Sequence, residues 1–260
     1  MHNAINEKLD LVTSVEGDPA HVDVPPRARP RRAQVDTEYL RRRRIYVSPD
    51  DEAAKIAISA FKSLRTHMLK TMQVKGVSCL AVTGATKLVG KSTVAANLAV
   101  NFARHQRKQV LLVDLDLRAP SVASLFGLSP RNGIDSVMDA RFSLEEALIQ
   151  TDIRGLSILP CVRGHENSTE ILLSEEMRRL FAVLRKPRPD HVVVFDGPPV
   201  LGCDDIPALA TVLDLFLVVV AEGQTTRREL REVIRLIGDA DVAAVVLNGS
   251  SEKSFRRYYY

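Results

Sequence analysis

The chain has 260 residues, of which 45% are hydrophobic, and this is enough for one α/β domain with a single core. The 36 basic and 32 acidic residues leave a net charge of +4, which by itself is too small to indicate nucleic-acid binding. The sequence has neither a signal-peptide pattern at its start nor an apolar run of about 20 residues. We therefore expect a cytoplasmic protein whose cysteines, Cys79, Cys161 and Cys203, are reduced thiols.

Residues 1–50 differ in composition from the rest of the chain. Five acids and one lysine in residues 1–24 are followed by eight arginines and two acids in residues 25–44. Such a segment buries too little apolar surface to offset its ordering entropy, so we predict a disordered charged arm. Its run Arg41–Arg44 is either a solvated charge run or a contact with anionic lipid or an acidic partner, and the residues do not discriminate between the two.

Residues 51–249 alternate helix and strand patterns. A helix is predicted to begin at Asp50 or Asp51 and to run through Met72, because its apolar residues recur at helical spacing. Apolar runs typical of buried strands begin at Val77, Val110, Leu156, Val192, Leu215 and Val242. Amphipathic helices are predicted after Gly90, after Ser174 and around Val233. This alternation predicts an α/β fold with a mostly parallel sheet and helices on both faces.

The first strand leads into a glycine-containing loop that opens a helix. The loop matches the phosphate-loop pattern GxxxxGK[ST] except at its first position, where Ala85 stands one residue after a glycine. In such a loop the backbone N–H groups wrap phosphates, the lysine bridges the outer phosphates and the following hydroxyl binds Mg²⁺. An ordinary strand-to-helix turn is the alternative, but the strand before and the helix after favour nucleotide binding. The predicted nucleotide-binding residues are Gly84, Ala85, Thr86, Lys87, Leu88, Val89, Gly90, Lys91, Ser92 and Thr93.

Aspartates follow two of the strands, at the edge where ligands bind in open α/β sheets. Asp114 and Asp116 point to the same side if the strand geometry persists, so one could hold magnesium through water while the other accepts a proton. Asp196 precedes Gly-Pro-Pro, which predicts that the chain leaves the sheet sharply after a second metal-binding acid. The alternatives, a helix cap or a strand-ending turn, do not explain why these acids accompany a phosphate loop. Asp204 and Asp205 are interpreted as capping or surface acids.

The predicted roles in this site are as follows. Catalytic residues are Lys91, Asp114 and Asp116, and metal ligands are Ser92, Asp116 and Asp196. The predicted phosphoacceptors are Tyr258, Tyr259 and Tyr260, which follow Arg256 and Arg257 at the end of the chain. A buried aromatic cluster is the alternative for these tyrosines, but chain termini are usually poorly ordered. Three regions are therefore predicted: an arm over 1–50, a domain over 51–249 and a flexible tyrosine tail over 250–260.

Together these residues resemble the bacterial tyrosine kinases of capsular and exopolysaccharide biosynthesis. The resemblance runs from about Ser59 to the C-terminus, and its most specific stretches are 110–120, 125–128, 167–173 and 194–199 with the tyrosine tail. It implies a P-loop NTPase fold of the deviant-Walker, partitioning-ATPase-like type and an ATP- and Mg²⁺-dependent autokinase. The matching lysine, hydroxyl and acids are Lys91, Ser92, Asp114, Asp116 and Asp196.

The same resemblance implies the biological setting. The kinase would be the stand-alone cytoplasmic form, recruited to the inner membrane and activated by a membrane polysaccharide co-polymerase, and it would regulate polymer synthesis and export. Its tail tyrosines would be phosphorylated between neighbouring subunits of a ring. Two departures stand out: the usual Pro-Gly-Glu-Gly-Lys loop reads Lys87-Leu-Val-Gly-Lys91 here, and Ser59 replaces the glutamate of the subunit-contact helix, which keeps Lys62 and Arg65.

Two other functions fit the phosphate loop. Partitioning and septum-positioning ATPase switches share the implied fold, but they carry a lysine five residues before the loop lysine, where this chain has Thr86. A nucleotide-binding scaffold without catalysis is the other alternative, because the loop and the contact helix are altered. Nucleic-acid binding ranks lowest, since Tyr39 and Tyr46 are the only aromatic residues near the arginines that could stack on bases.

Overall fold

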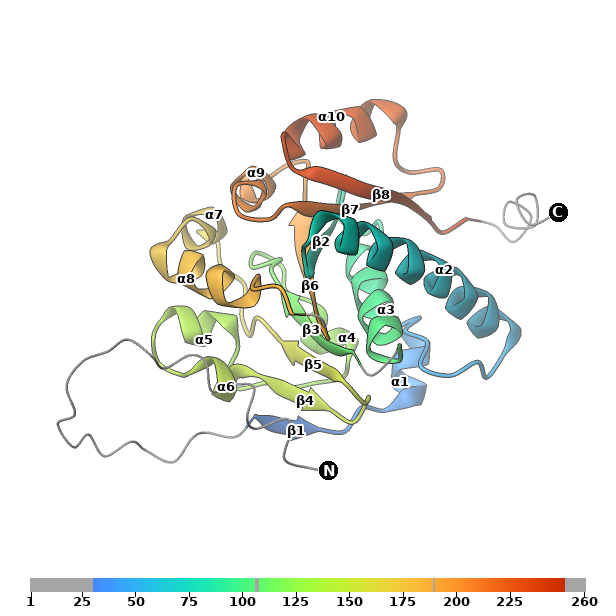
Figure 1. Ribbon diagram of the computed structural model, residues 1–260, viewed down its shortest axis with the longest axis horizontal. Coiled ribbons are helices and arrows are strands. Elements are labelled where there is room, and N and C mark those ends of the chain that lie inside the picture. Colours follow the sequence, from blue (N-terminus) through green and yellow to red (C-terminus); the bar gives the residue numbers. More distant parts are fainter. Residues whose placement is uncertain (1–29, 106–107, 189, 251–260) are drawn as a thin grey trace.

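The computed structural model describes residues 30–105, 108–188 and 190–250, and it consists of one sheet with helices on both faces (Figure 1). The sheet has eight strands in the order β1-β4-β5-β3-β6-β2-β7-β8. All neighbouring strands run parallel except β4 and β5, which are antiparallel. The prediction of a mostly parallel α/β sheet is therefore confirmed.

The elements of the described residues have the following bounds. The strands are β1 (Arg31–Ala33), β2 (Cys79–Gly84), β3 (Gln109–Asp114), β4 (Ile149–Thr151), β5 (Leu156–Leu159), β6 (His191–Pro199), β7 (Leu215–Ala221) and β8 (Asp241–Asn248). The helices are α1 (Thr37–Arg42), α2 (Glu52–Lys75), α3 (Lys91–Ala103), α4 (Val122–Leu125), α5 (Ile134–Met138), α6 (Leu144–Ala147), α7 (Ser168–Leu172), α8 (Glu175–Leu184), α9 (Asp205–Ala210) and α10 (Arg227–Ile237).

The central strands are buried on both faces, which explains why their sequences are continuously apolar. In β2, Leu80 and Val82 belong to the core beneath α2 and α3. The alternate residues Cys79 and Ala81 belong to a second core, beneath α8 and α9. Figure 1 shows the two helix layers on opposite sides of the sheet. The two apolar clusters together make one domain around one sheet.

The ends of α2 follow from local chemistry. Asp51 is its N-cap, and its carboxylate accepts a hydrogen bond from the Ala54 N–H at 2.7 Å. The predicted start is therefore confirmed. The helix runs to Lys75, three residues beyond the predicted end at Met72, and it stops at Gly76, which takes the left-handed conformation with φ 68°.

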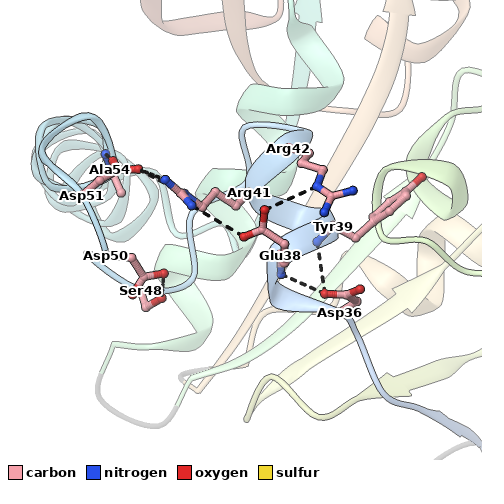
Figure 2. Close-up of polar contacts among 9 residues, drawn as sticks. All are labelled: Asp36, Glu38, Tyr39, Arg41, Arg42, Ser48, Asp50, Asp51 and Ala54. Carbon is pink, nitrogen blue, oxygen red and sulfur yellow. Dashed lines mark hydrogen bonds and ion pairs between the residues drawn. The ribbon is translucent and has the colours of Figure 1, made fainter.

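The prediction of a disordered arm is wrong for residues 30–50. Strand β1 pairs with β4, with Arg31 opposite Ile149, and α1 is capped by Asp36, which accepts from two backbone N–H groups of its first turn (Figure 2). Leu40 and Ile45 are fully buried. Three buried apolar side chains, those of Val35, Leu40 and Ile45, and one pairing strand thus order a segment whose composition resembles that of disordered chains. Residues 1–29 of the predicted arm and residues 251–260 of the predicted tail lie outside the described residues.

The arginine run makes contacts within the chain. Arg41 pairs with Asp51, the N-cap of α2, and Arg42 pairs with Glu38 at 3.4 Å (Figure 2). The guanidinium of Arg43 lies 5.3 Å from the centroid of the Tyr39 ring. Exposed ion pairs contribute little stability, so these contacts position α1 more than they stabilise it. A contact of the run with lipid or an acidic partner stays a prediction.

Two further observations concern the cysteines and the possibility of membrane-spanning helices. All three cysteines carry free thiols, and Cys79 and Cys161 are buried. Within the described ranges, no helix combines the length and the apolar character needed to cross a membrane.

The burial of Leu40 leads to a stability prediction. Leu40→Ala should lower the free energy of unfolding by about 2–5 kcal/mol, because it leaves a cavity in the core. Leu173→Ala is the matched control, since Leu173 is 54% exposed, and its effect should stay within about 0.5 kcal/mol. Chemical denaturation of both variants measures the difference. Equal effects would mean that α1 does not share the core of the domain.

Candidate functional site

The predicted phosphate loop connects β2 to α3, and its shape depends on two glycines. An added Cβ at Gly84 would collide with Val89, and one at Gly90, where φ is 89°, would collide with Asn248. The Asn248 amide donates to the Val89 carbonyl oxygen at 2.9 Å, so the end of β8 closes the loop from outside. Sequence reasoning missed Asn248, because no local pattern connects residue 248 to residue 89.

Helix α3 begins directly at the loop, with Gly90 as its N-cap. No side chain of the described residues caps this end, which leaves first-turn N–H groups available to an anion. The helix is long enough, at 13 residues, to carry a dipole. This end of α3 therefore has the backbone geometry that phosphate binding requires.

Leu88 occupies an unusual backbone conformation at the tip of the loop. Its φ is 64°, in the left-handed region, and its side chain is 97% exposed. It stands at the position of the glycine in the Pro-Gly-Glu-Gly-Lys loop of the resembling family. The loop therefore keeps the backbone turn that glycine normally provides, at a cost of roughly 1–2 kcal/mol for a residue with a Cβ.

Lys91 is the central cation of the site. Its ammonium donates to Asp116 Oδ2 at 2.7 Å and to Ser92 Oγ at 3.4 Å, and its side chain is 10% exposed. Burial pushes the pKa of Lys91 down, but the carboxylates of Asp196 and Asp116 outweigh burial, and the net pKa is raised. The side chain is therefore held in its charged form.

Asp114 is the last residue of β3 and is fully buried. Its Oδ2 accepts hydrogen bonds from the backbone N–H groups of Ser121 and Val122, both at 2.9 Å. Its Oδ1 is buried without a hydrogen-bond partner among the described residues. Burial, together with repulsion from Asp196, raises the pKa of Asp114 well above its usual range.

Asp116 lies beyond the end of β3, so the strand geometry does not persist to it. Its carboxylate accepts hydrogen bonds from the Lys91 ammonium and from the Ala119 N–H, the latter at 3.2 Å.

Asp196 lies opposite Asp114 on the neighbouring strand, and the Cα atoms of the two residues are paired in register. Both its carboxylate oxygens are buried without a hydrogen-bond partner among the described residues. Burial raises the pKa of Asp196 to about 6, although the charge of Lys91 and the nearby Ser92 hydroxyl act in the opposite direction. The Ser92 hydroxyl lies close enough to affect this pKa, but its geometry falls short of a hydrogen bond.

The predicted sharp exit after Asp196 is wrong, because β6 continues through Pro199 beside β2. The prolines are tolerated because β3 pairs with β6 only as far as Asp114, so they face a strand on one side alone. Past Asp196, Thr83 Oγ1 donates to the Pro198 carbonyl oxygen at 2.6 Å. The same strand therefore supplies the acid and supports the base of the loop.

The unpaired oxygens of Asp196 and Asp114 are consistent with a bound cation. The described residues contain no group of three or more His, Cys, Asp or Glu side chains that could hold a metal ion by themselves. Magnesium, however, usually binds through one or two protein oxygens together with phosphate and water. Ser92, Asp116 and Asp196 fit that kind of site, and nucleotide phosphates would supply its remaining ligands.

A second polar cluster lies beside the site and corrects the interpretation of Asp205. Asp205 is fully buried, and it accepts hydrogen bonds from Ser168 Oγ at 3.0 and 2.9 Å and from the Thr169 hydroxyl. Arg118, two residues after Asp116, donates to Ser168 Oγ at 3.3 Å. Asp205 is therefore neither a cap nor a surface acid, and it ties α7 and α9 to the chain after β3. Asp204 is exposed, as predicted.

Comparison with known proteins identifies the family. The chain matches the AAA domain family over residues 79–243. It is 30% identical over 215 residues to the tyrosine-protein kinase YwqD of Bacillus subtilis, covering 79% of this chain and 90% of YwqD. The chain belongs to the bacterial tyrosine-protein kinase family. The putative tyrosine-protein kinase EpsB of Ralstonia solanacearum is 34% identical over 224 residues. These residues make up 85% of the present chain but only 28% of EpsB.

Solved structures agree with the family assignment. The kinase domain of the Escherichia coli tyrosine kinase ETK superposes with a TM-score of 0.71 at 25% identity, over 79% of this chain and 78% of that one. The BceF tyrosine kinase domain gives 0.65 at 28% identity, over 74% and 77%. The septum site-determining protein MinD of Pyrococcus horikoshii, solved with Mg-ADP, gives 0.55 at 23% identity, over 67% and 72%, and shows the shared fold alone. The resemblance and the P-loop NTPase fold predicted from the sequence are confirmed.

The conformation of Leu88 leads to a prediction about the loop. Leu88→Gly should leave the free energy of unfolding unchanged or raise it by up to about 1 kcal/mol. Glycine relieves the strain of the left-handed backbone, which stabilises the fold, but it loses more conformational entropy on folding, which offsets part or all of that gain. Lys87→Gly is the control in the same loop, where no strain is relieved, and it should lower stability by roughly 0.5–1 kcal/mol. Thermal and denaturant unfolding measure both. Equal losses in the two variants would contradict the strain at Leu88.

The unpaired oxygens of Asp196 lead to a prediction about magnesium. Asp196→Asn should weaken ATP binding with Mg²⁺ by at least tenfold, and it should change metal-free ATP binding by less than about threefold, since an amide is a poor magnesium ligand. Titration calorimetry with ATP, with Mg²⁺ and with EDTA, measures the two affinities. Equal weakening in both conditions would assign Asp196 a structural role.

Proposed function

We propose that the protein is an ATP- and magnesium-dependent protein-tyrosine kinase that phosphorylates its own C-terminal tyrosines. One observation carries this proposal: Lys91 and the buried acids Asp114, Asp116 and Asp196 converge at the start of α3, beside a loop with phosphate-binding geometry. Membership of the tyrosine-protein kinase family supports the choice of acceptor.

Nucleotide binding begins with an exchange of partners. In the structure Lys91 forms an ion pair with Asp116. Incoming phosphates offer Lys91 a stronger set of acceptors, while the N–H groups of the loop and of α3 wrap the same oxygens. Lys91 would then contact the outer phosphates, and Asp116, no longer paired with Lys91, would hold magnesium together with Ser92 and Asp196. The bound ion would neutralise charge that develops on the phosphates during transfer.

Asp114 is the proposed proton acceptor. The phenol oxygen of a tyrosine forms a bond to the γ-phosphorus, the bond from that phosphorus to the bridging oxygen breaks, and ADP leaves. The phenol proton passes to Asp114, whose raised pKa makes it a better base than an ordinary aspartate. Two amides hold one oxygen of Asp114 in place, which leaves Oδ1 for the proton.

The acceptor tyrosines are proposed to be Tyr258, Tyr259 and Tyr260 of a neighbouring copy. Strand β8 ends at Asn248, against the phosphate loop, and about ten residues separate it from the tyrosines. A short tether limits how the tail can turn back into the chain's own site, and the family resemblance implies transfer between neighbouring subunits, so we take a neighbour's site as the destination. Phosphorylation would add about −1.5 to −2 charge to each tyrosine and loosen any assembly that depends on the tail.

The setting is proposed from the family resemblance. A membrane polysaccharide co-polymerase would recruit and activate the kinase at the inner membrane, and the kinase would regulate exopolysaccharide synthesis and export. Self-association would use α2, where Ser59 and Lys62 are exposed. Arg65 does not join these residues in the proposed contact surface, because it donates a hydrogen bond to the Asn101 carbonyl oxygen of α3 at 3.3 Å. Nucleic-acid binding is not part of the proposal.

The kinase proposal is tested by separating enzyme from substrate. Lys91→Met should abolish phosphorylation by the variant itself, because its contact with the outer phosphates is worth several kcal/mol in the transition state. The variant with Phe at residues 258–260 should still phosphorylate an added tyrosine peptide. When the two are mixed with ATP and Mg²⁺, mass spectrometry should find phosphate on the tail of the Lys91→Met chain.

The outcomes separate the parts of the proposal. Unchanged phosphotyrosine in Lys91→Met alone would exclude the kinase mechanism. A tail that stays unmodified in the mixture, while the peptide is phosphorylated, would leave the kinase but remove transfer between copies.

A further inference from the structure

The N-terminal segment reaches the candidate site through one tyrosine. Tyr39 lies on α1, and its hydroxyl donates a hydrogen bond to the Ser124 carbonyl oxygen of α4 at 2.8 Å. Its ring lies against Gly127, where an added Cβ would come within 3.2 Å of it. A residue outside the matched AAA domain region therefore contacts a turn inside it.

Contacts within α1 hold Tyr39 in this position. Arg43 donates from Nη2 to the tyrosine oxygen at 3.2 Å, and its guanidinium lies over the ring. Helix α1 is fixed in turn by its cap, Asp36, and by the pair that Arg41 makes with Asp51 (Figure 2). Tyr39 is thus presented to α4 by an ordered helix.

Helix α4 is the element that orients Asp114. Its first N–H groups, those of Ser121 and Val122, donate to Asp114 Oδ2, while Oδ1 has no partner among the described residues. These two amides therefore fix how the carboxylate is turned. A helix of four residues does not hold its shape alone, so the orientation of Asp114 depends on what holds α4.

Apart from the two amide hydrogen bonds to Asp114, two kinds of contact hold α4. Val122 and Phe126 are buried in the core and fix its depth, but apolar burial is non-directional and leaves the turn free to rotate. The hydrogen bond from Tyr39 is directional and restricts that rotation. Apolar burial therefore sets the depth of α4 in the core, and the hydrogen bond from Tyr39 sets its orientation.

We propose that Tyr39 is a positioning residue of the phosphoryl-transfer site, which fixes the orientation of Asp114 through α4. The proposal rests on the proton-accepting role of Asp114 proposed above. Without the hydroxyl of Tyr39, the turn moves and the carboxylate spends less time in the orientation that the transfer requires. ATP binding is unaffected, because the phosphate loop and not α4 holds the nucleotide.

The test uses the purified full chain and an added tyrosine peptide. Tyr39→Phe keeps the ring and removes the hydroxyl, and we expect kcat to fall about fivefold, the effect of one hydrogen bond of average strength, with KM for ATP unchanged. Amide hydrogen exchange should become faster in residues 121–128 and stay unchanged in β2 and α3. Tyr46→Phe is the control from the same segment, since Tyr46 contacts Asn97 through its backbone N–H at 3.0 Å, and it should match the wild type.

Asp114→Asn separates this proposal from the proposed function. If Asp114→Asn is inactive while Tyr39→Phe has wild-type kcat, the positioning role is wrong and the kinase mechanism stands. The positioning role would also be overturned if kcat of Tyr39→Phe fell only together with a higher KM for ATP and faster amide hydrogen exchange throughout the sheet. If Asp114→Asn retains full activity, the proton-accepting role fails, and the role of Tyr39 fails with it.

Discussion

The burial of three carboxylates around one ammonium group is the constraint on which this structure depends. Asp114, Asp116 and Asp196 are all buried, and Lys91 is the cation that they share. Removing such charges from water costs several kcal/mol each unless they are paired, and here the acids outnumber the cation. The pKa values of Asp114 and Asp196 rise as a consequence. A site with surplus buried negative charge is poised for a cation, and magnesium with its nucleotide would supply one.

The parallel sheet brings these charges together. Asp114 and Asp196 end up opposite one another because β3 and β6 run side by side in register. Lys91 reaches them because β2, which precedes the phosphate loop, pairs with the other edge of β6. The carboxyl ends of parallel strands meet at one edge of a sheet, so three distant segments need no further device to converge.

The elements around the site fix it from the outside. Asn248 at the end of β8 closes the phosphate loop, and Asp205 secures the turn that contains Arg118 through Ser168. Tyr39 contacts α4, whose amides hold Asp114. Each contact is a directional hydrogen bond between segments far apart in sequence. Rigid support of this kind is what keeps reacting groups in place for phosphoryl transfer.

The sequence by itself determined the sheet class, the phosphate loop and the family. Continuous apolar runs are buried on both faces in a parallel sheet, and the loop pattern with Lys91 and Ser92 is local, so both can be read along the chain. Six of the eight strands of the described residues, and the loop after β2, lie where these patterns predicted them, whereas β1 and β4 were not predicted. The resemblance also rests on contiguous stretches, and the comparisons bear it out.

Only the tertiary structure decided the order of residues 30–50 and the partners of the site. Their composition predicted disorder, but Leu40 is buried and β1 pairs with β4, and neither fact is encoded locally. Asp205 was interpreted as a capping or surface acid, but in the fold it is buried and accepts hydrogen bonds from two hydroxyls of α7. The physical reason is the same throughout: burial and hydrogen bonding depend on what packs against a residue, and that partner comes from another part of the chain.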